Sequence, residues 1–187
     1  MGRDKSALPV NGEPLWRRQL GILRATKPAE LFISGKSDGP YAGCGLEILA
    51  DEFPGCGPLA GIASALRRCA SEYLLVLAAD MPAMTADFLR ILLDESRRTG
   101  AGVVPSVAAE DMKIGERCLE PLAAIYPRGA LRFAEECLRA GERKMETFIR
   151  VLESQGLVTI RPIEPDAIHL FANWNTPEDL EASERAK

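Results

Sequence analysis

Two aspartates in this sequence each follow a short apolar run, a pattern that places carboxylates at one edge of a sheet. Asp51 follows LEILA at 46–50, and Asp80 follows YLLVLAA at 73–79. In an open α/β sheet, ligands bind beyond the carboxyl ends of the strands. Mg²⁺ is held by one or two carboxylates, and water and substrate phosphates complete its shell. The two aspartates therefore predict an edge that could hold a phosphorylated ligand with its metal.

Each aspartate also has a purely structural interpretation. An aspartate after a strand often forms a turn or caps the next helix. Thr85 already offers a cap to the helix predicted over 85–100, so for Asp80 a ligand role and a turn role both stay open. Asp51 precedes the loop sequence EFPGCGPLAG, where a solvated loop acid is the alternative to a ligand.

The segment PGCGPLAG at 54–61 places Gly55, Gly57 and Gly61 around a predicted helix start. Glycines let a ligand approach the backbone, and a helix N-terminus offers free N–H groups to an anion. The alternative is an ordinary turn with Pro58 at the first helical position.

Two further groups of residues lie near the ends of the chain. Gly2 and Lys5 could contact phosphate, but the P-loop pattern G-x-x-x-x-G-K-[ST] is absent, and a surface lysine is the alternative. In FANWNTPEDL at 171–180, the threonine and proline are enough to start a helix. The start of this helix therefore does not require Asn173 or Asn175.

Helical and strand patterns alternate along the chain with short connections. Helices are predicted over 14–25, 57–69, 85–100, 129–141, 144–156 and 176–186, and strands over 30–34, 46–51, 72–80, 101–106, 120–127 and 157–163. Such alternation predicts an α/β fold with a doubly wound, mostly parallel sheet. With no repeat or linker, residues 1–187 are expected to form one domain.

Composition excludes several classes of protein. The chain is 47% hydrophobic, enough for a sizeable core, and its 23 basic and 27 acidic residues include no long basic run, which argues against nucleic-acid binding. Five irregularly spaced cysteines and a single histidine, His169, favour reduced thiols in a cytoplasmic protein over a zinc site or a disulfide framework. No apolar run approaches the ~20 residues that a membrane span needs.

Four segments together resemble one family. They are MGRDKSALPVNGEPLW at 1–16, DEFPGCGPLAGIASAL at 51–66, AADMP at 78–82 and FANWNTPEDL at 171–180. Their order and rough spacing are similar to those of the molybdenum cofactor guanylyltransferases, which belong to the nucleoside-triphosphate transferase superfamily. The resemblance implies a Rossmann-like nucleotidyltransferase fold. In that family a strand and a loop of the form LAGGxSxR precede MGxDK, so we expect this chain to be N-terminally incomplete, without the first strand and the glycine-rich loop.

The resemblance also implies an activity, namely transfer of GMP from GTP to molybdenum-molybdopterin with release of pyrophosphate. Mg²⁺ is the implied cofactor, GTP and molybdopterin are the implied substrates, and transient contact with other proteins of molybdenum cofactor biosynthesis is expected. Two alternatives stay open: a related transferase that uses CTP or a sugar phosphate, and an inactive nucleotide-binding remnant.

Site residues follow from the same resemblance. Lys5 and Asp80 match catalytic positions, and Asp80 also matches the metal-binding acid. The implied nucleotide-binding residues are Gly2, Lys5, Ser34, Asp51, Gly57 and Asp80, where Ser34 stands at a position that is asparagine in some relatives. Asn173 and Asn175 match the motif near the pterin substrate.

Overall fold

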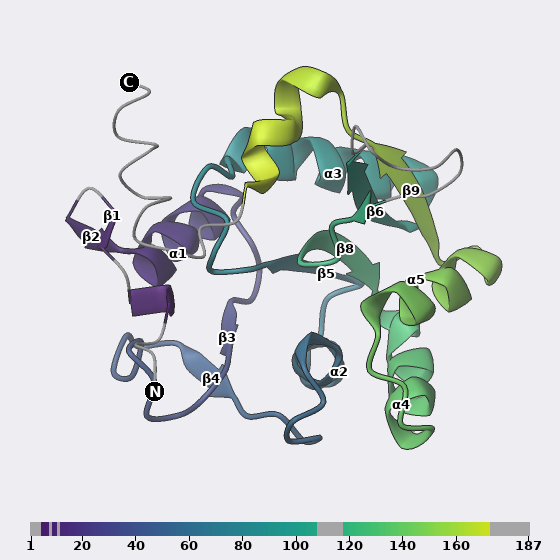
Figure 1. Cartoon of the computed structure of the whole chain (residues 1–187), viewed down its shortest axis with the longest axis horizontal. Helices are drawn as coiled ribbons and strands as arrows, with labels where there is room; N and C mark the ends of the chain where they lie inside the picture. Colours follow the sequence, from purple (N-terminus) through teal and green to yellow (C-terminus); the bar gives the residue numbers. More distant parts are fainter. Residues whose placement is uncertain (1–4, 8, 11, 108–117, 173–187) are drawn as a thin grey trace.

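The computed structural model describes residues 5–7, 9–10, 12–107 and 118–172. Its largest sheet is built from β5 (Tyr73–Leu77), β8 (Ala123–Pro127), β6 (Gly102–Val107), β7 (Cys118–Leu119) and β9 (Val158–Pro162). A separate pair is formed by β3 (Phe32–Ser34) and β4 (Glu47–Leu49), and a short hairpin by β1 (Pro9–Val10) and β2 (Glu13–Pro14). Figure 1 shows the β3–β4 pair beside the β5 edge of the large sheet.

The directions of the strands confirm an α/β fold with parallel pairing. β3 pairs with β4 in parallel, and so does β6 with β9. β8 runs antiparallel to both β5 and β6, so β5, β6 and β9 share one direction. The antiparallel insertion of β8 was not predicted. Its apolar sequence AAIYP shows burial on both faces but carries no information about direction.

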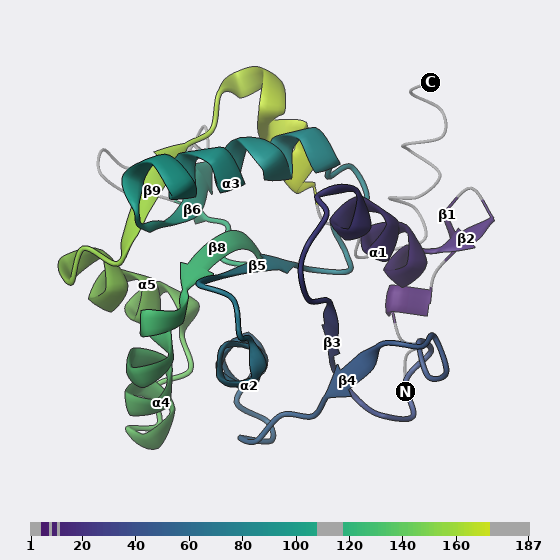
Figure 2. The same ribbon diagram turned by 180° about the vertical axis from the view of Figure 1, so that it is seen from behind.

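Helices cover both faces of the large sheet (Figures 1 and 2). One face carries α1 (Leu15–Ala25), α3 (Ala86–Thr99) and the 3₁₀ helix η3 (Pro165–Phe171). The other face carries α2 (Pro58–Arg68), α4 (Leu131–Arg139) and α5 (Met145–Ser154). Two shorter 3₁₀ helices are η1 (Lys5–Ala7) and η2 (Arg128–Ala130). Each helical layer packs its own apolar cluster against the sheet.

Local sequence signals set several of these boundaries. The Phe88 N–H donates to Thr85 Oγ1 at 3.2 Å, which confirms Thr85 as the cap of α3. Gly100, with φ of 70°, ends the same helix in the left-handed conformation. The short elements β1, β2, β7 and η3 were not predicted because they lack a periodic apolar pattern. The helix predicted over 176–186 lies outside the described residues. None of the described helices combines the length and apolarity that a membrane crossing requires.

Candidate functional site

A cavity of about 800 Å³ lies between β3 and β5 and collects several of the predicted site residues. Ser34 ends β3, Asp51 follows β4, and Gly57 precedes α2; all three line this cavity. Ser6 of η1 lines it as well. The structure therefore brings together three of the residues that the resemblance implies bind the nucleotide.

Gly61 permits the close approach of α2 to the end of β3. A Cβ atom at this position would overlap Ser34 Oγ and would lie 3.5 Å from Asp51 Oδ1. The first turn of α2 thus packs directly on two of the predicted nucleotide-binding side chains. Partial burial in this corner raises the pKa of the Asp51 carboxyl above its ordinary value.

The start of α2 has the geometry of an anion-binding helix N-terminus. Gly57 is the N-cap residue with φ of 71° and ψ of −159°, a conformation that only glycine adopts without strain. Pro58 occupies the first turn, which contains no acidic residue. The positive end of this helix therefore borders the cavity, and the Asp51 carboxylate lies against the same turn.

Tyr41 is a site residue that sequence reasoning missed. It is buried, it lines the cavity, and its hydroxyl accepts a hydrogen bond from the Lys36 N–H at 2.9 Å. Its ring packs edge-on against Trp16 of α1, with centroids 6.5 Å apart. These contacts anchor the loop that follows Ser34 to α1.

Asp80 lies in the turn after β5, and this turn is held by α1. The side-chain amide of Gln19 donates to the carbonyl oxygens of Ala78 at 3.1 Å and Met81 at 2.7 Å. Arg18 Nε donates to the Pro82 carbonyl oxygen at 2.9 Å. Asp80 is half-buried and does not line the cavity, whereas Ala78 does.

Glu120 is a second carboxylate close to Asp80, and it too was missed. Burial, followed by the negative charge of Asp80, raises the pKa of Glu120 to about 7. Its backbone N–H donates to the Pro105 carbonyl oxygen at 2.8 Å, which ties it to β6. In the sequence, Glu120 was only the first residue of a predicted strand, and nothing there indicated its proximity to Asp80.

The Asp80–Glu120 pair fits the preferences of Mg²⁺. This ion takes oxygen ligands and commonly uses only one or two carboxylates, with water and phosphate completing its shell. No group of three or more histidine, cysteine, aspartate or glutamate side chains that could hold a metal occurs among the described residues. Two neighbouring carboxylates could hold a divalent cation together with a phosphorylated substrate.

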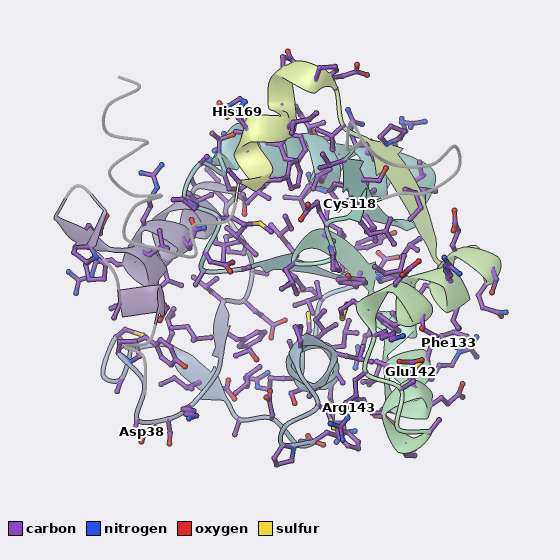
Figure 3. The ribbon with its side chains drawn as sticks, in the orientation of Figure 1. Asp38, Cys118, Phe133, Glu142, Arg143 and His169 are labelled. Atoms are coloured by element: carbon purple, nitrogen blue, oxygen red, sulfur yellow. The ribbon has the colours of Figure 1, made fainter. Side chains whose placement is uncertain are left out.

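The remaining predicted residues are placed only in part. Lys5 begins η1, next to the cavity-lining Ser6, but its side chain is outside what the structure describes. Gly2, Asn173 and Asn175 lie outside the described residues. Figure 3 shows His169 on η3 at the upper edge of the molecule, far from Asp38 in the loop after β3.

Comparison with known proteins decides the family. The family model for the MobA-like NTP transferase domain matches residues 1–157. The chain belongs to this family. Among its relatives, a "Probable molybdenum cofactor guanylyltransferase" from Opitutus terrae is 36% identical over 99% of this chain and 89% of the relative. A protein of the same name from Pelotomaculum thermopropionicum is 33% identical over 96% of this chain and 83% of its own length.

Solved structures agree with this assignment to the MobA-like family. Molybdopterin-guanine dinucleotide biosynthesis protein A from Archaeoglobus fulgidus matches with a TM-score of 0.73 and 25% identity, over 99% of this chain and 91% of that one. The 2-C-methyl-D-erythritol 4-phosphate cytidylyltransferase from Thermus thermophilus matches with a TM-score of 0.75 at 18% identity, over 97% and 93% of the two chains. The second match shows the nucleotidyltransferase fold alone.

Proposed function

We propose that this chain is a guanylyltransferase that transfers GMP from GTP to molybdenum-molybdopterin and releases pyrophosphate. The observation that carries the proposal is the convergence of Ser34, Asp51 and the α2 N-terminus on one cavity, next to the turn that holds Asp80. The relatives named for this reaction match nearly the whole chain, which supports guanine as the base.

In the proposed reaction, a terminal phosphate oxygen of molybdopterin attacks the α-phosphorus of GTP. A new P–O bond forms, the bond to the pyrophosphate oxygen breaks, and no covalent protein intermediate is needed. The protein acts by positioning the two phosphates and by neutralising charge. Mg²⁺, when bound, would supply positive charge that neutralises the phosphates.

The residues of this chain have distinct roles in the proposal. Asp80, with Glu120 beside it, would hold the cation. Lys5 contacts the triphosphate, and Ser34, Asp51 and the backbone around Gly57 contact the nucleotide; Gly2 belongs to the same set. Asn173 and Asn175 contact the pterin. Gln19 is a positioning residue, because it fixes the turn that carries Asp80 without pointing a charge at the substrate.

Turnover with a panel of nucleotides tests this function. The purified chain is incubated with molybdopterin, Mg²⁺ and GTP or CTP, and pyrophosphate release is followed together with formation of the dinucleotide. We expect product with GTP and at least about tenfold less with CTP. A preference for CTP, or transfer to a sugar phosphate, would support the alternative transferase. Nucleotide binding without any turnover would support an inactive remnant.

A further inference from the structure

The loop that carries Asp51 to the cavity depends on contacts from other elements. Residues 51–57, which we call the Asp51 loop, connect β4 to α2 and form no helix or strand. Asp51, Glu52 and Gly57 are exposed. Inside the loop, the Cys56 N–H donates to the Phe53 carbonyl oxygen at 3.2 Å. An exposed loop holds its side chains in one position only when neighbouring elements support it.

A row of residues on α2 follows the start of this loop. Gly61, Ser64 and Arg67 are three positions apart, so each is a surface neighbour of the next. Asp51 Oδ1 lies 3.5 Å from the position that a Cβ atom of Gly61 would take. The Glu52 N–H donates to the buried Ser64 Oγ at 3.4 Å, and the Glu52 carboxylate pairs with Arg67. Asp51 and Glu52 therefore lie along α2 in a fixed register.

Arg67 also reaches a third element of the fold. Its Nη1 donates to Glu52, and its Nη2 donates to Glu135 Oε1 on α4 at 2.6 Å. Glu135 is itself held, because its other oxygen accepts a hydrogen bond from Arg139 Nη2 at 2.6 Å. Both views show α4 beside α2 (Figures 1 and 2). One guanidinium thus ties the Asp51 loop to two helices.

The contacts of Arg67 span the chain, whereas several other ion pairs join residues of one helix. Arg67 is 15 positions from Glu52 and 68 from Glu135, while Arg150 and Glu146 are four apart on α5. Hydrogen bonds from Arg67 and then from Arg139 lower the pKa of Glu135, so this carboxylate is charged at neutral pH. An arginine bonded to two carboxylates through separate nitrogens restricts the movement of both.

The effect of this bridge is expected to be local. The side chains of Arg67 and Glu52 are 42% and 46% exposed, and exposed ion pairs contribute little to global stability. Neither residue lines the cavity, so neither is placed to touch a ligand there. Their influence on the site must pass through the neighbouring Asp51, which does line it.

We propose that Arg67 is a positioning residue for nucleotide binding, which holds Asp51 against α2 by bonding Glu52 and Glu135 at once. The inference rests on the proposed function, in which Asp51 contacts the nucleotide. A loop that is ordered before its ligand arrives loses less conformational freedom on binding, and this raises affinity.

GTP titration with a pair of opposite charge changes tests the proposal. Arg67→Gln removes a positive charge and Glu52→Gln removes a negative one, yet both break the same ion pair. We expect each variant to bind GTP about five- to tenfold more weakly, because the loop must then be ordered by the ligand. A long-range charge effect would instead strengthen binding in Glu52→Gln. Opposite changes in the two variants would therefore overturn the proposal.

A double variant shows whether both residues act through one contact. Arg67→Gln combined with Glu52→Gln should bind GTP about as weakly as either single variant, because the second change removes nothing further. Arg67→Lys keeps the charge but lacks the planar fork that serves two carboxylates, so its affinity should be intermediate. Losses that multiply in the double variant would contradict a shared role.

Two matched controls lie on exposed parts of α4 and α5. Glu136→Gln neutralises the neighbour of Glu135, and Arg150→Gln breaks the exposed ion pair with Glu146. Both controls should bind GTP like the wild type. An equal loss in either control would assign the effect to surface charge in general.

Steady-state turnover separates positioning of the nucleotide from a role in the chemical step. Arg67→Gln should raise the KM for GTP and leave kcat within about twofold of the wild type, because the bridge acts on a nucleotide contact. A lower kcat with an unchanged KM would overturn the proposal.

Amide exchange without nucleotide distinguishes this inference from the proposed function. Amides of the Asp51 loop should exchange at least about threefold faster in Arg67→Gln, and those of α3 should be unchanged. Melting temperatures should differ by less than about 3 °C. If the wild type bound no GTP, the proposed function would be wrong, and loop exchange would still decide whether Arg67 holds the loop. Unchanged exchange in the Asp51 loop would overturn the positioning role.

Discussion

The side-chain amide of Gln19 donates to the carbonyl oxygen of Met81 at 2.7 Å, across 62 positions of sequence. Gln19 is buried on α1, and Met81 directly follows Asp80. A second bond from the same nitrogen reaches the Ala78 carbonyl, so one side chain brackets the turn on both sides of Asp80. The position of the proposed metal-binding carboxylate thus depends on a helix from a distant part of the chain.

Gln19→Leu should destabilise the protein and reduce turnover. Leucine removes the donor and leaves two carbonyls without their partner, for an expected loss of about 1–3 kcal/mol in the free energy of unfolding. Denaturant unfolding measures the loss. Gln155→Leu, at an exposed position after α5, should stay within about 0.5 kcal/mol of the wild type. Equal stability of all three proteins would contradict the bracing role of Gln19.

Asp80→Asn should leave the fold intact and lower Mg²⁺-dependent turnover by about 10²–10³-fold. The substitution removes the charge that would hold the cation, which supplies several kcal/mol of charge stabilisation in such reactions. Thermal melting and turnover at varied Mg²⁺ are measured together, and a chelator should abolish wild-type activity. Asp94→Asn, on the exposed face of α3, is the matched control. Near-normal turnover of Asp80→Asn at saturating Mg²⁺ would make the metal assignment wrong.

Gly57→Ala and Gly21→Ala should change stability in opposite directions. Alanine at 57 would be forced into a positive φ, at a cost of about 1–3 kcal/mol, and should also weaken GTP binding at the start of α2. Alanine at 21, inside α1 with no atom within 4 Å of its Cβ, should stabilise by about 0.5–1 kcal/mol. Unfolding and GTP titration of both variants provide the check. If Gly21→Ala also lost affinity for GTP, the loss in Gly57→Ala would not be specific to the start of α2.

Glu30→Gln should change how steeply the stability of the folded protein falls at acidic pH. Hydrogen bonds from the Ala70 and Ser71 N–H groups, with the positive charge of Arg68, lower the pKa of Glu30 below its ordinary value. The folded state therefore binds the proton less tightly than the unfolded state, so this contribution is present above pH ~4.5 and is lost as the pH falls through the lowered value. The variant should be less stable near neutral pH and show a shallower decline in acid, measured by melting from pH 3 to 8. Glu164→Gln, an exposed change, should retain the wild-type profile.

Lys5→Ala should weaken binding of GTP more than binding of guanosine. A lysine ammonium acts as a point charge on phosphate, so its removal should cost about tenfold or more in affinity for the triphosphate and little for the nucleoside. Titration calorimetry with both ligands measures the difference. Lys144→Ala, an exposed lysine directly before α5 that does not line the cavity, provides a charge-matched control. Equal losses for GTP and guanosine would favour a structural role.

Sequence reasoning predicted much of the fold because its signals are local. The apolar periodicity of α1, the Thr85 cap and the apolar runs of β5 and β6 each specify an element within a few residues. It also predicted Ser34 and Asp51 as site residues, and the structure places them in one cavity.

What sequence reasoning missed depends on distant contacts. The pairing of β8 between β5 and β6, and the proximity of Glu120 to Asp80, arise from the topology of the sheet. The role of Gln19 likewise requires knowing that α1 packs on the turn after β5. An isolated glutamate or glutamine in a sequence has no periodicity that reveals its partner.

The position of β8 dictates the order in which this molecule can assemble on the ribosome. Leu77 pairs with Ala123 and Tyr73 with Pro127. The pairing of β5 with β8 can therefore form only after the ribosome has made a strand that lies roughly fifty residues later in the chain. The Ala78 N–H, at the entrance to the Asp80 turn, likewise finds its 2.7 Å acceptor only when Leu122 has been synthesised. Nascent chains that end before residue 123 expose the apolar run YLLVL. During translation, the strand that leads into the Asp80 turn is thus open to aggregation until β8 has been made.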